Sequence, residues 1–310
     1  MDKELSRLKQ TYHDIEIPAE LAAVTQQAIE RGKSQRKRTI TRNRWMKTMS
    51  ASTAAVLAIF VISVNTMPAF ANSLEDVPGL GKLVKILQFN KGSAEGGTIQ
   101  DSTDVSFITL RQQGSNETIT LNFTKQNQTQ EKVNAFHVKF TEYPNTMTFS
   151  VGGARAFSAV KDFETLKKSE YIQDAYEIIT LDDSLIRFNV TFNKAITYDV
   201  KEYADPAQVV ITITPDDAKE KQRQPVYSLR TASHPYGETQ GAAEEALLGW
   251  ENIRILKDRE GTFFVEAGYY ATETEARAKL KQLEEQGVIG ERMYVEEREP
   301  MQLPMVISPE

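Results

Sequence analysis

The chain has 310 residues, of which 40% are hydrophobic, and its 37 Lys and Arg against 43 Asp and Glu give a formal net charge of −6. This length leaves room for roughly two or three domains. The absence of cysteine excludes disulfides and thiolate metal sites, and the 3 histidines are far apart in sequence. We therefore expect no metal and no cofactor.

The first 47 residues predict a short helical head. Apolar residues recur there at steps of three and four residues, which predicts two helices with one apolar face each. These faces carry Leu5, Leu8, Tyr12, Ile15, Leu21 and Val24. Helices this short are not stable alone, so two hypotheses stay open. The head is either a frayed tail whose apolar faces lie on the membrane, or a docking element that a cytoplasmic protein covers.

An uncharged stretch follows, centred on the apolar run from Ala51 to Val64. A bilayer-spanning helix needs about 20 mostly apolar residues, so residues 48–71 are long enough to be a transmembrane helix. Residues 31–47 contain basic but no acidic residues, and basic residues resist translocation. This pattern predicts a single-pass protein of the cell membrane with a cytoplasmic N-terminus and an extracytoplasmic C-terminus. A buried core helix and a signal peptide are the alternatives.

The outer end of this stretch contains the small-x-small motif of a signal peptidase site. Ala69 and Ala71 supply the small side chains, and Pro68 disfavours a continuing helix. Two interpretations stay open. Either alanine at this position has no further role, or the chain is cut between Ala71 and Asn72.

The sequence around the apolar stretch resembles a known family. The head contains Ile17-Pro-Ala-Glu-Leu21, a basic lead precedes the apolar stretch, and Val77-Pro-Gly-Leu-Gly-Lys-Leu-Val-Lys85 follows it. These features are similar to the front of membrane-anchored anti-sigma factors of Gram-positive bacteria, closest to the zinc-free, lysozyme-responsive group. The resemblance covers residues 1 to about 89. It implies that the head sequesters an alternative sigma factor, which is released when signal peptidase and then an intramembrane protease cut the anchor.

Residues 72–104 are interpreted as a juxtamembrane segment and linker, because residues 90–104 are rich in Gly and small polar residues. Residues 105–215 predict a β-rich extracytoplasmic domain, because apolar and polar residues alternate with a period of two. The alternating stretches are 119–124, 136–140, 147–151 and 186–192. A helix is expected from Asp162 to about Tyr176. Residues 186–214 are similar to the last strands of periplasmic β-domains that precede cell-wall amidases.

Residues 225–298 predict the element order β-α-β-β-α-β, which is that of the ferredoxin-like split unit. Strands are expected at 226–233, 253–257, 263–269 and 292–296. Thr272 and Glu275 form a capping box that starts the second helix, which ends at Gly287. A charged linker precedes this unit and a tail, residues 299–310, follows it. The whole prediction is an α+β protein with a helical head, one transmembrane helix, a β-rich domain and a ferredoxin-like domain.

The stretch from Phe263 to Gly287 resembles sporulation-related repeat domains, which bind the glycan strands of peptidoglycan. The resemblance covers about residues 225–298, and such a unit is expected to fold alone. In that family the glycan lies on the sheet face, so the resemblance implies glycan binding by Arg254, Tyr269 and Tyr294. Packing of the aromatic residues against the helices is the alternative.

No catalytic motif occurs in the sequence, so we expect no enzyme activity. Gly152 and Gly153 either bind an anion or mark a bulge or turn. The acidic outer part argues against direct nucleic-acid binding.

Two functions stay open. The first is an anti-sigma factor that binds a sigma factor inside the cell and senses peptidoglycan or another envelope ligand outside it. The second is a membrane-tethered protein that holds peptidoglycan through its last domain.

Overall fold

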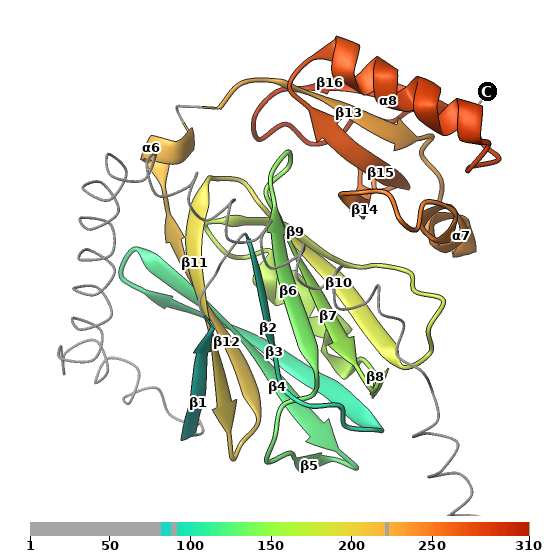
Figure 1. Cartoon of the computed structure of the whole chain (residues 1–310). Coiled ribbons are helices and arrows are strands. Elements are labelled where there is room, and N and C mark those ends of the chain that lie inside the picture. Colours follow the sequence, from blue (N-terminus) through green and yellow to red (C-terminus); the bar gives the residue numbers. More distant parts are fainter. Residues whose placement is uncertain (1–81, 88–91, 221–222, 310) are drawn as a thin grey trace, which may run out of the picture. The chain divides into compact units, whose positions relative to one another are not determined.

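The computed structural model describes residues 82–87, 92–220 and 223–309, which form a β-sandwich and a C-terminal α+β domain (Figure 1). Both parts belong to one compact unit, Gly79–Glu310. The described residues are rich in strands with few helices, in agreement with the predicted α+β class. The predicted head, transmembrane helix and cleavage motif lie outside the described residues. Within the described ranges, no helix is both long and apolar enough to cross a membrane.

The first sheet of the sandwich has seven strands. Its hydrogen-bonded order is β1-β11-β12-β4-β3-β8, and β5 pairs with β4. Its strands are β1 (Lys82–Leu87), β3 (Thr103–Gln113), β4 (Asn116–Lys125), β5 (Gln128–Thr129), β8 (Ala154–Ala156), β11 (Ile196–Ala204) and β12 (Gln208–Pro215). All of these pairs are antiparallel except β3 with β8.

The second sheet has five strands in the order β2-β6-β7-β10-β9, all antiparallel. Its strands are β2 (Ser93–Gly96), β6 (Phe136–Thr141), β7 (Thr146–Gly152), β9 (Ile172–Glu177) and β10 (Leu185–Phe192). A 3-10 turn, η1 (Ser158–Asp162), and a short helix, α5 (Phe163–Leu166), add side chains to the core of the sandwich.

The predicted alternation explains how these strands form the sandwich. In β10, Phe188, Val190 and Phe192 belong to the hydrophobic core shared by the two sheets. Their neighbours Arg187 and Asn189 make polar contacts outside that core. The four alternating stretches predicted from the sequence lie in β4, β6, β7 and β10 and are confirmed as strands.

In the sandwich, one predicted helix and one predicted linker differ from the structure. The helix expected up to Tyr176 ends at Leu166, because the hydroxyl of Ser169 accepts hydrogen bonds from the amides of Tyr171 and Ile172, and β9 begins there. The stretch 72–104, expected as a linker, contains β1, β2 and the start of β3. Backbone pairing at sheet edges holds β1 and β2, and a Gly- and Ser-containing strand such as β2 gives no alternating pattern.

The C-terminal domain has the predicted order of elements. They are β13 (Val226–Thr231), α7 (Glu238–Ala246), β14 (Ile253–Lys257), β15 (Phe263–Tyr270), α8 (Glu273–Gln286) and β16 (Met293–Arg298). The sheet order β14-β15-β13-β16 is antiparallel throughout, as in the ferredoxin-like unit. The capping box is confirmed, because the amide of Glu275 bonds the Thr272 hydroxyl and the Thr272 amide bonds the Glu275 carboxylate, each at 3.3 Å. A short helix, α6 (Asp217–Glu220), precedes the domain.

The hydrophobic core of the C-terminal domain includes two residues of the sandwich. Leu229, Ile255 and Leu283 belong to this core together with Tyr176 and Ile178, which are 6% and 2% exposed. The domain predicted to fold alone therefore shares its core with the preceding domain.

Candidate functional site

The residues predicted to bind a sigma factor and to be cleaved lie outside the described residues. They are Leu5, Leu8, Tyr12, Ile15, Leu21, Val24, Ala69, Ala71 and Asn72. Their roles stay predictions. The structure describes only the predicted glycan-binding residues.

Arg254, Tyr269 and Tyr294 lie on one face of the C-terminal sheet, as predicted. Arg254 is opposite Glu266 across β14 and β15. Tyr269 pairs with Ser228, and Tyr294 pairs with Arg230, both on β13. Since residues opposite each other share a face, these side chains are neighbours on the sheet.

This face is not open around Arg254, whose side chain is enclosed by the sandwich. The guanidinium donates to the Glu266 carboxylate at 2.6 Å, to the Thr141 hydroxyl at 2.6 Å and to the Tyr143 carbonyl oxygen at 2.7 Å. The ring of Tyr269 lies 5.2 Å from the ring of Tyr143. The loop between β6 and β7 therefore occupies the position that the resemblance assigns to a glycan.

The same face contains a buried charge cluster of three arginines and two glutamates. Its members are Arg230, Arg254, Arg298, Glu266 and Glu296. Arg298 bonds both carboxylates at 2.8 Å, and Arg230 bonds Glu296 at 3.0 Å. Arg230, Arg298 and Glu266 are 0% exposed. A buried charge is tolerated when it is paired and hydrogen-bonded, and these contacts meet that condition.

Burial and the neighbouring charges shift the pKa values of Glu266, Arg298 and Arg230. Burial raises the pKa of Glu266, but the charges of Arg254 and Arg298 outweigh it, and the pKa lies below its ordinary value. Burial lowers the pKa of Arg298, yet Glu266 and Glu296 reverse this effect and the pKa lies above its ordinary value. Burial also lowers the pKa of Arg230, although Glu296 opposes the shift. An arginine pKa remains far above neutrality in every such case.

The residues after β16, expected as a tail, cover another part of this face. The carbonyl oxygen of Met305 accepts a hydrogen bond from Arg230, and its amide donates to Glu296, both at 2.7 Å. Ser233 and Ile307 are joined by a backbone hydrogen bond of 2.7 Å. Tyr294 remains half-buried, with the guanidinium of Arg292 centred 5.3 Å from its ring. Of the predicted glycan-binding residues, Arg254 is hydrogen-bonded to other residues of the protein, and Tyr269 and Tyr294 are only partly exposed.

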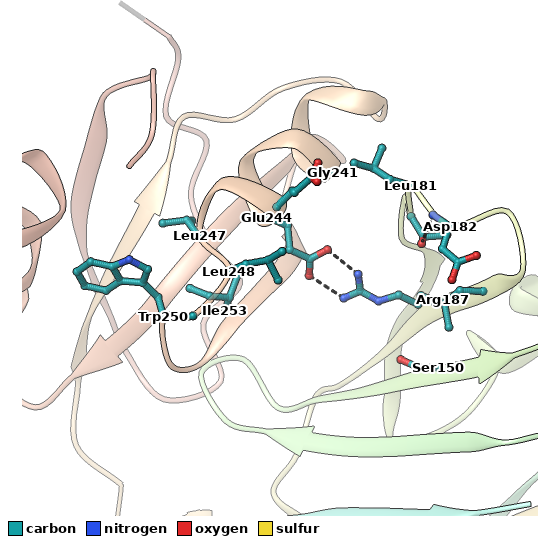
Figure 2. Close-up of a pocket in the computed structure, with 14 residues that line it drawn as sticks. Ser150, Leu181, Asp182, Arg187, Gly241, Glu244, Leu247, Leu248, Trp250 and Ile253 are labelled. Atoms are coloured by element: carbon teal, nitrogen blue, oxygen red, sulfur yellow. Dashed lines mark hydrogen bonds and ion pairs between the residues drawn. The ribbon is translucent and has the colours of Figure 1, made fainter. Parts of the chain in front are cut away.

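A cleft of about 680 Å³ is lined by residues of both the sandwich and the C-terminal domain (Figure 2). The sandwich contributes Arg187 and Asp182, and the C-terminal domain contributes Glu244, Leu248 and Trp250, among others. Figure 2 shows Arg187 and Glu244 pointing toward one another, with two parallel hydrogen bonds of 2.6 and 2.8 Å. This bidentate ion pair crosses the junction between the two domains and is largely shielded from water.

The edge strand of the C-terminal sheet is also fastened to the sandwich at this junction. The side-chain amide of Asn189 donates to the Ile255 carbonyl at 2.9 Å, and the Lys257 amide donates to the Tyr176 hydroxyl at 3.2 Å. The Lys257 ammonium also pairs with Asp174. Side chains of the sandwich thus satisfy backbone groups that a sheet edge leaves unpaired.

A second cleft, of about 400 Å³, lies on the C-terminal domain and has an aromatic lining. Trp250, Tyr269 and Tyr270 line it together with amide and charged side chains. The other lining side chains are Glu251, Asn252, Lys279, Gln282 and Gln286. Trp250 follows the end of α7 and is half-buried. Its position in the loop before β14 gives no periodic signal, so sequence reasoning missed this cleft.

The glycine pair at 152–153 is explained by close packing. Gly153 has a φ of +72°, and a Cβ atom there would lie 1.8 Å from the carbonyl oxygen of Gln100. The Asn134 side chain donates to the Gly152 carbonyl at 2.9 Å. These contacts favour the turn interpretation over the anion site.

The described residues offer little for catalysis. Within those ranges, no group of three or more His, Asp and Glu side chains is placed to hold a metal ion. Two histidines lie beside single carboxylates: His234 is 3.0 Å from Glu291, and His137 is 3.8 Å from Glu95. The absence of enzyme activity stays a prediction.

Comparison with known proteins gives two matches. Residues 41–131 match a domain of unknown function, DUF4179. The chain is also 28% identical over 221 residues to the anti-sigma-V factor RsiV of Bacillus subtilis (strain 168), which covers 65% of this chain and 73% of that protein. No solved structure matches the chain. The chain is therefore similar to an anti-sigma factor across the greater part of both sequences.

Proposed function

We propose that this protein is an anti-sigma factor that is anchored in the cell membrane by one helix. The observation that carries the proposal is the similarity to the anti-sigma-V factor RsiV over 73% of its length. The apolar faces of the predicted head, such as that formed by Leu5 and Leu8, provide the surface for an alternative sigma factor. The protein acts by binding and needs neither a cofactor nor catalytic residues.

The proposed release of the sigma factor is by regulated proteolysis on an envelope signal. Signal peptidase cuts between Ala71 and Asn72, and an intramembrane protease then destroys the remaining anchor. The small residues Ala69 and Ala71 and the helix-disfavouring Pro68 support this part of the proposal. The folded part that the structure describes begins at Lys82, ten residues after Asn72, and in this proposal it receives the signal.

Capture of partners by the isolated head, residues 1–47, tests the anti-sigma proposal. The wild-type head is expected to retain a sigma factor from a cell extract, identified by mass spectrometry. Leu8→Asp places a charge on the apolar face, where full burial of a leucine is worth about 1.5–3 kcal/mol, and should abolish capture. Gln10→Asp adds the same charge on the other side of the helix and is the matched control. Equal capture by both variants would contradict the proposal.

A second candidate function is glycan binding by the C-terminal domain, and the aromatic cleft favours it. Aromatic rings such as Trp250 and Tyr270 stack on the apolar faces of sugar rings, and the amides of Gln282 and Gln286 suit sugar hydroxyls. We propose that peptidoglycan binds in this cleft, because Arg254 on the sheet face is already engaged by the sandwich. Glycan binding is compatible with the anti-sigma function, because the outer part of a signalling protein can bind the cell wall. Without a sigma-factor partner, glycan binding would instead make the protein a membrane-tethered wall-binding protein.

Pelleting of the Gly79–Glu310 fragment with purified wall sacculi tests this second function. Trp250→Ala should weaken pelleting if the cleft binds glycan, whereas Tyr294→Ala, on the sheet face, should leave it unchanged. Weaker pelleting of Tyr294→Ala with unchanged pelleting of Trp250→Ala would instead indicate a glycan site on the sheet face. Pelleting no stronger than that of an unrelated acidic protein would remove the glycan hypothesis.

A further inference from the structure

The aromatic cleft adjoins the cleft at the junction of the two domains. The aromatic cleft, which contains Tyr270, and the junction cleft, which contains Arg187 and Glu244, share Gly249 and Trp250 in their linings. Gly249 has no side chain to separate the clefts, and a Cβ atom there would meet no atom within 4 Å. Their volumes of about 400 and 680 Å³ each lie in the range of sites for drug-sized ligands. A glycan that fills both clefts is therefore an oligomer rather than a single sugar.

The junction cleft in turn adjoins a third cleft, of about 620 Å³, on the sandwich. Ser150, Asp182 and Leu185 line both of them. The third cleft lies at the end of β7, at Gly152, and is also lined by Ile99. We call the three adjoining clefts the groove. A series of clefts with shared lining residues suits an extended polymer better than a compact ligand.

The groove offers apolar side chains to a ligand along its course. Leu248 and Leu181 line the junction cleft and are 75% and 57% exposed. In Figure 2, Leu248 and Asp182 lie on opposite sides of the Arg187–Glu244 ion pair. Exposed apolar side chains that gather in a cleft indicate a binding surface, and aliphatic groups can cover the C–H faces of sugar rings.

The groove is acidic, with six acidic side chains against three basic ones. The acidic residues are Glu95, Asp101, Asp182, Glu244, Glu245 and Glu251, and the basic residues are Arg155, Arg187 and Lys279. Both arginines are already paired, Arg187 with Glu244 and Arg155 with Asp101 and Asp183. Within the described part of the chain, Asp182, Glu245 and Glu251 form no ion pair. The groove therefore has negative charge available for a ligand.

One of these free carboxylates is fixed in place by its own loop. The Oδ1 atom of Asp182 accepts hydrogen bonds from the hydroxyl and the amide of Ser184, at 2.7 and 2.8 Å. These two bonds hold the pKa of Asp182 below its ordinary value, so the carboxylate is charged at neutral pH. Asp182 lines both the junction cleft and the third cleft. A fixed negative charge thus lies where the two clefts meet.

We propose that the groove binds a glycan strand in which some amino sugars have lost their acetyl groups and carry free amines. This inference deepens the second candidate function and rests on it. The aromatic rings and leucines contact the apolar faces of the sugars, and Asp182 and Glu245 pair with ammonium groups. A fully acetylated strand has only neutral groups at these positions and gains nothing from the carboxylates, whereas an anionic polymer is repelled by them.

Binding of two matched oligomers to the full-length chain, purified in detergent, tests the inference. One is a six-sugar oligomer of N-acetylglucosamine, and the other is the same oligomer without its acetyl groups. At about pH 6 the exposed carboxylates and the amines are charged, and calorimetry should show about tenfold tighter binding of the amino oligomer, which corresponds to about 1.4 kcal/mol. At about pH 9 the amines are neutral, and the two affinities should become similar.

The double variant Asp182→Asn with Glu245→Gln should remove this preference and leave binding of the acetylated oligomer unchanged. The asparagine keeps an oxygen that accepts from Ser184, so the loop retains its hydrogen bonds. Glu284→Gln is the matched control, because Glu284 is exposed on the other side of α8 from Gln282, which lines the aromatic cleft. This control should keep the full preference.

Trp250→Ala should give a different pattern, because a stacked ring does not sense the amine. It should weaken binding of both oligomers by a similar factor and keep the preference for the amino form. Circular dichroism of each variant establishes that the chain is folded.

Equal affinity for the two oligomers at about pH 6 would overturn the inference and leave the glycan function standing. If neither oligomer binds, the inference is wrong, and pelleting with wall sacculi then shows whether the glycan function is wrong as well. Tighter binding of a six-residue oligolysine than of the amino oligomer would assign the groove to basic peptides and also overturn the inference.

Discussion

Asn189, on the outer face of the sandwich, donates a 2.9 Å hydrogen bond to the carbonyl oxygen of Ile255, on the edge strand of the C-terminal sheet. Ile255 itself belongs to a hydrophobic core that includes Tyr176 and Ile178 of the sandwich. Polar and apolar contacts thus join the two domains along the same strand. The sandwich and the C-terminal domain are expected to unfold together.

The first prediction follows from this shared core. Ile178→Ala should destabilise the Gly79–Glu310 fragment by about 2–5 kcal/mol, because a buried isoleucine leaves a cavity when it is truncated. Denaturant unfolding should show one transition in the wild type and in the variant. Ile99→Ala, at a position 85% exposed, is the control and should change stability by less than about 0.5 kcal/mol. Two separate transitions would show that the domains are independent.

A second prediction concerns the hydroxyl of Tyr176, which accepts hydrogen bonds from the Lys257 amide and the Asn189 side chain. Tyr176→Phe leaves these donors without an acceptor and should cost about 1–3 kcal/mol. Hydrogen exchange at the Lys257 amide should accelerate more than exchange in β15. Tyr171→Phe also removes a hydroxyl hydrogen bond, a part-buried one to the Ser115 carbonyl away from the junction, so it should leave the Lys257 amide protected.

The third prediction is a pH dependence caused by Glu266. Its pKa is lower in the folded protein than in the unfolded chain, so its contribution is fully present above the ordinary glutamate value and is lost as the pH falls through the folded value. Wild-type stability should therefore decrease below about pH 4.5. Glu266→Gln should cost about 3–5 kcal/mol at pH 7, because it leaves buried arginines short of a counter-charge.

The same variant should also show a shallower loss of stability on acidification. Glu297→Gln, at an exposed position on β16, two strands away in the same sheet, is the control. Identical pH profiles of wild type and Glu266→Gln would mean that this carboxylate does not govern acid unfolding.

The fourth prediction tests the cleavage motif. Terminal sequencing of the released ectodomain should begin at Asn72. Ala71→Trp introduces a side chain too large for a signal peptidase site and should block both release and induction of the target promoters. Phe70→Leu keeps both small residues and should be processed normally. Full induction in the Ala71→Trp variant would show that another cut controls the sigma factor.

Local sequence signals predicted much of the fold. The alternation of Phe188, Val190 and Phe192 identified a strand, and the capping box of Thr272 and Glu275 identified the start of α8, because both signals depend on near neighbours. The same kind of signal failed for β1 and β2, whose positions depend on partners at least 40 residues away in sequence.

The candidate site was harder to predict for a related reason. The resemblance to sporulation-related repeat domains placed Arg254 on an open sheet face. In the structure this face holds the buried charge cluster, because the loop at Tyr143 and the segment around Met305 cover it. Periodicity shows which side chains share a face, but the neighbour that covers a face comes from elsewhere in the chain. The junction cleft and the aromatic cleft were missed because loops contribute much of their lining.

The bonding of β14 by sandwich side chains has a consequence for crowding at a membrane. In the proposed anchored state, copies in one bilayer share an orientation and collide repeatedly in two dimensions, where an open sheet edge can recruit the edge of a neighbour. The carbonyl of Ile255 and the amide of Lys257 are already engaged by Asn189 and Tyr176. Strand-to-strand polymerisation through this edge is therefore disfavoured, and neighbouring copies can accumulate without joining their sheets along β14.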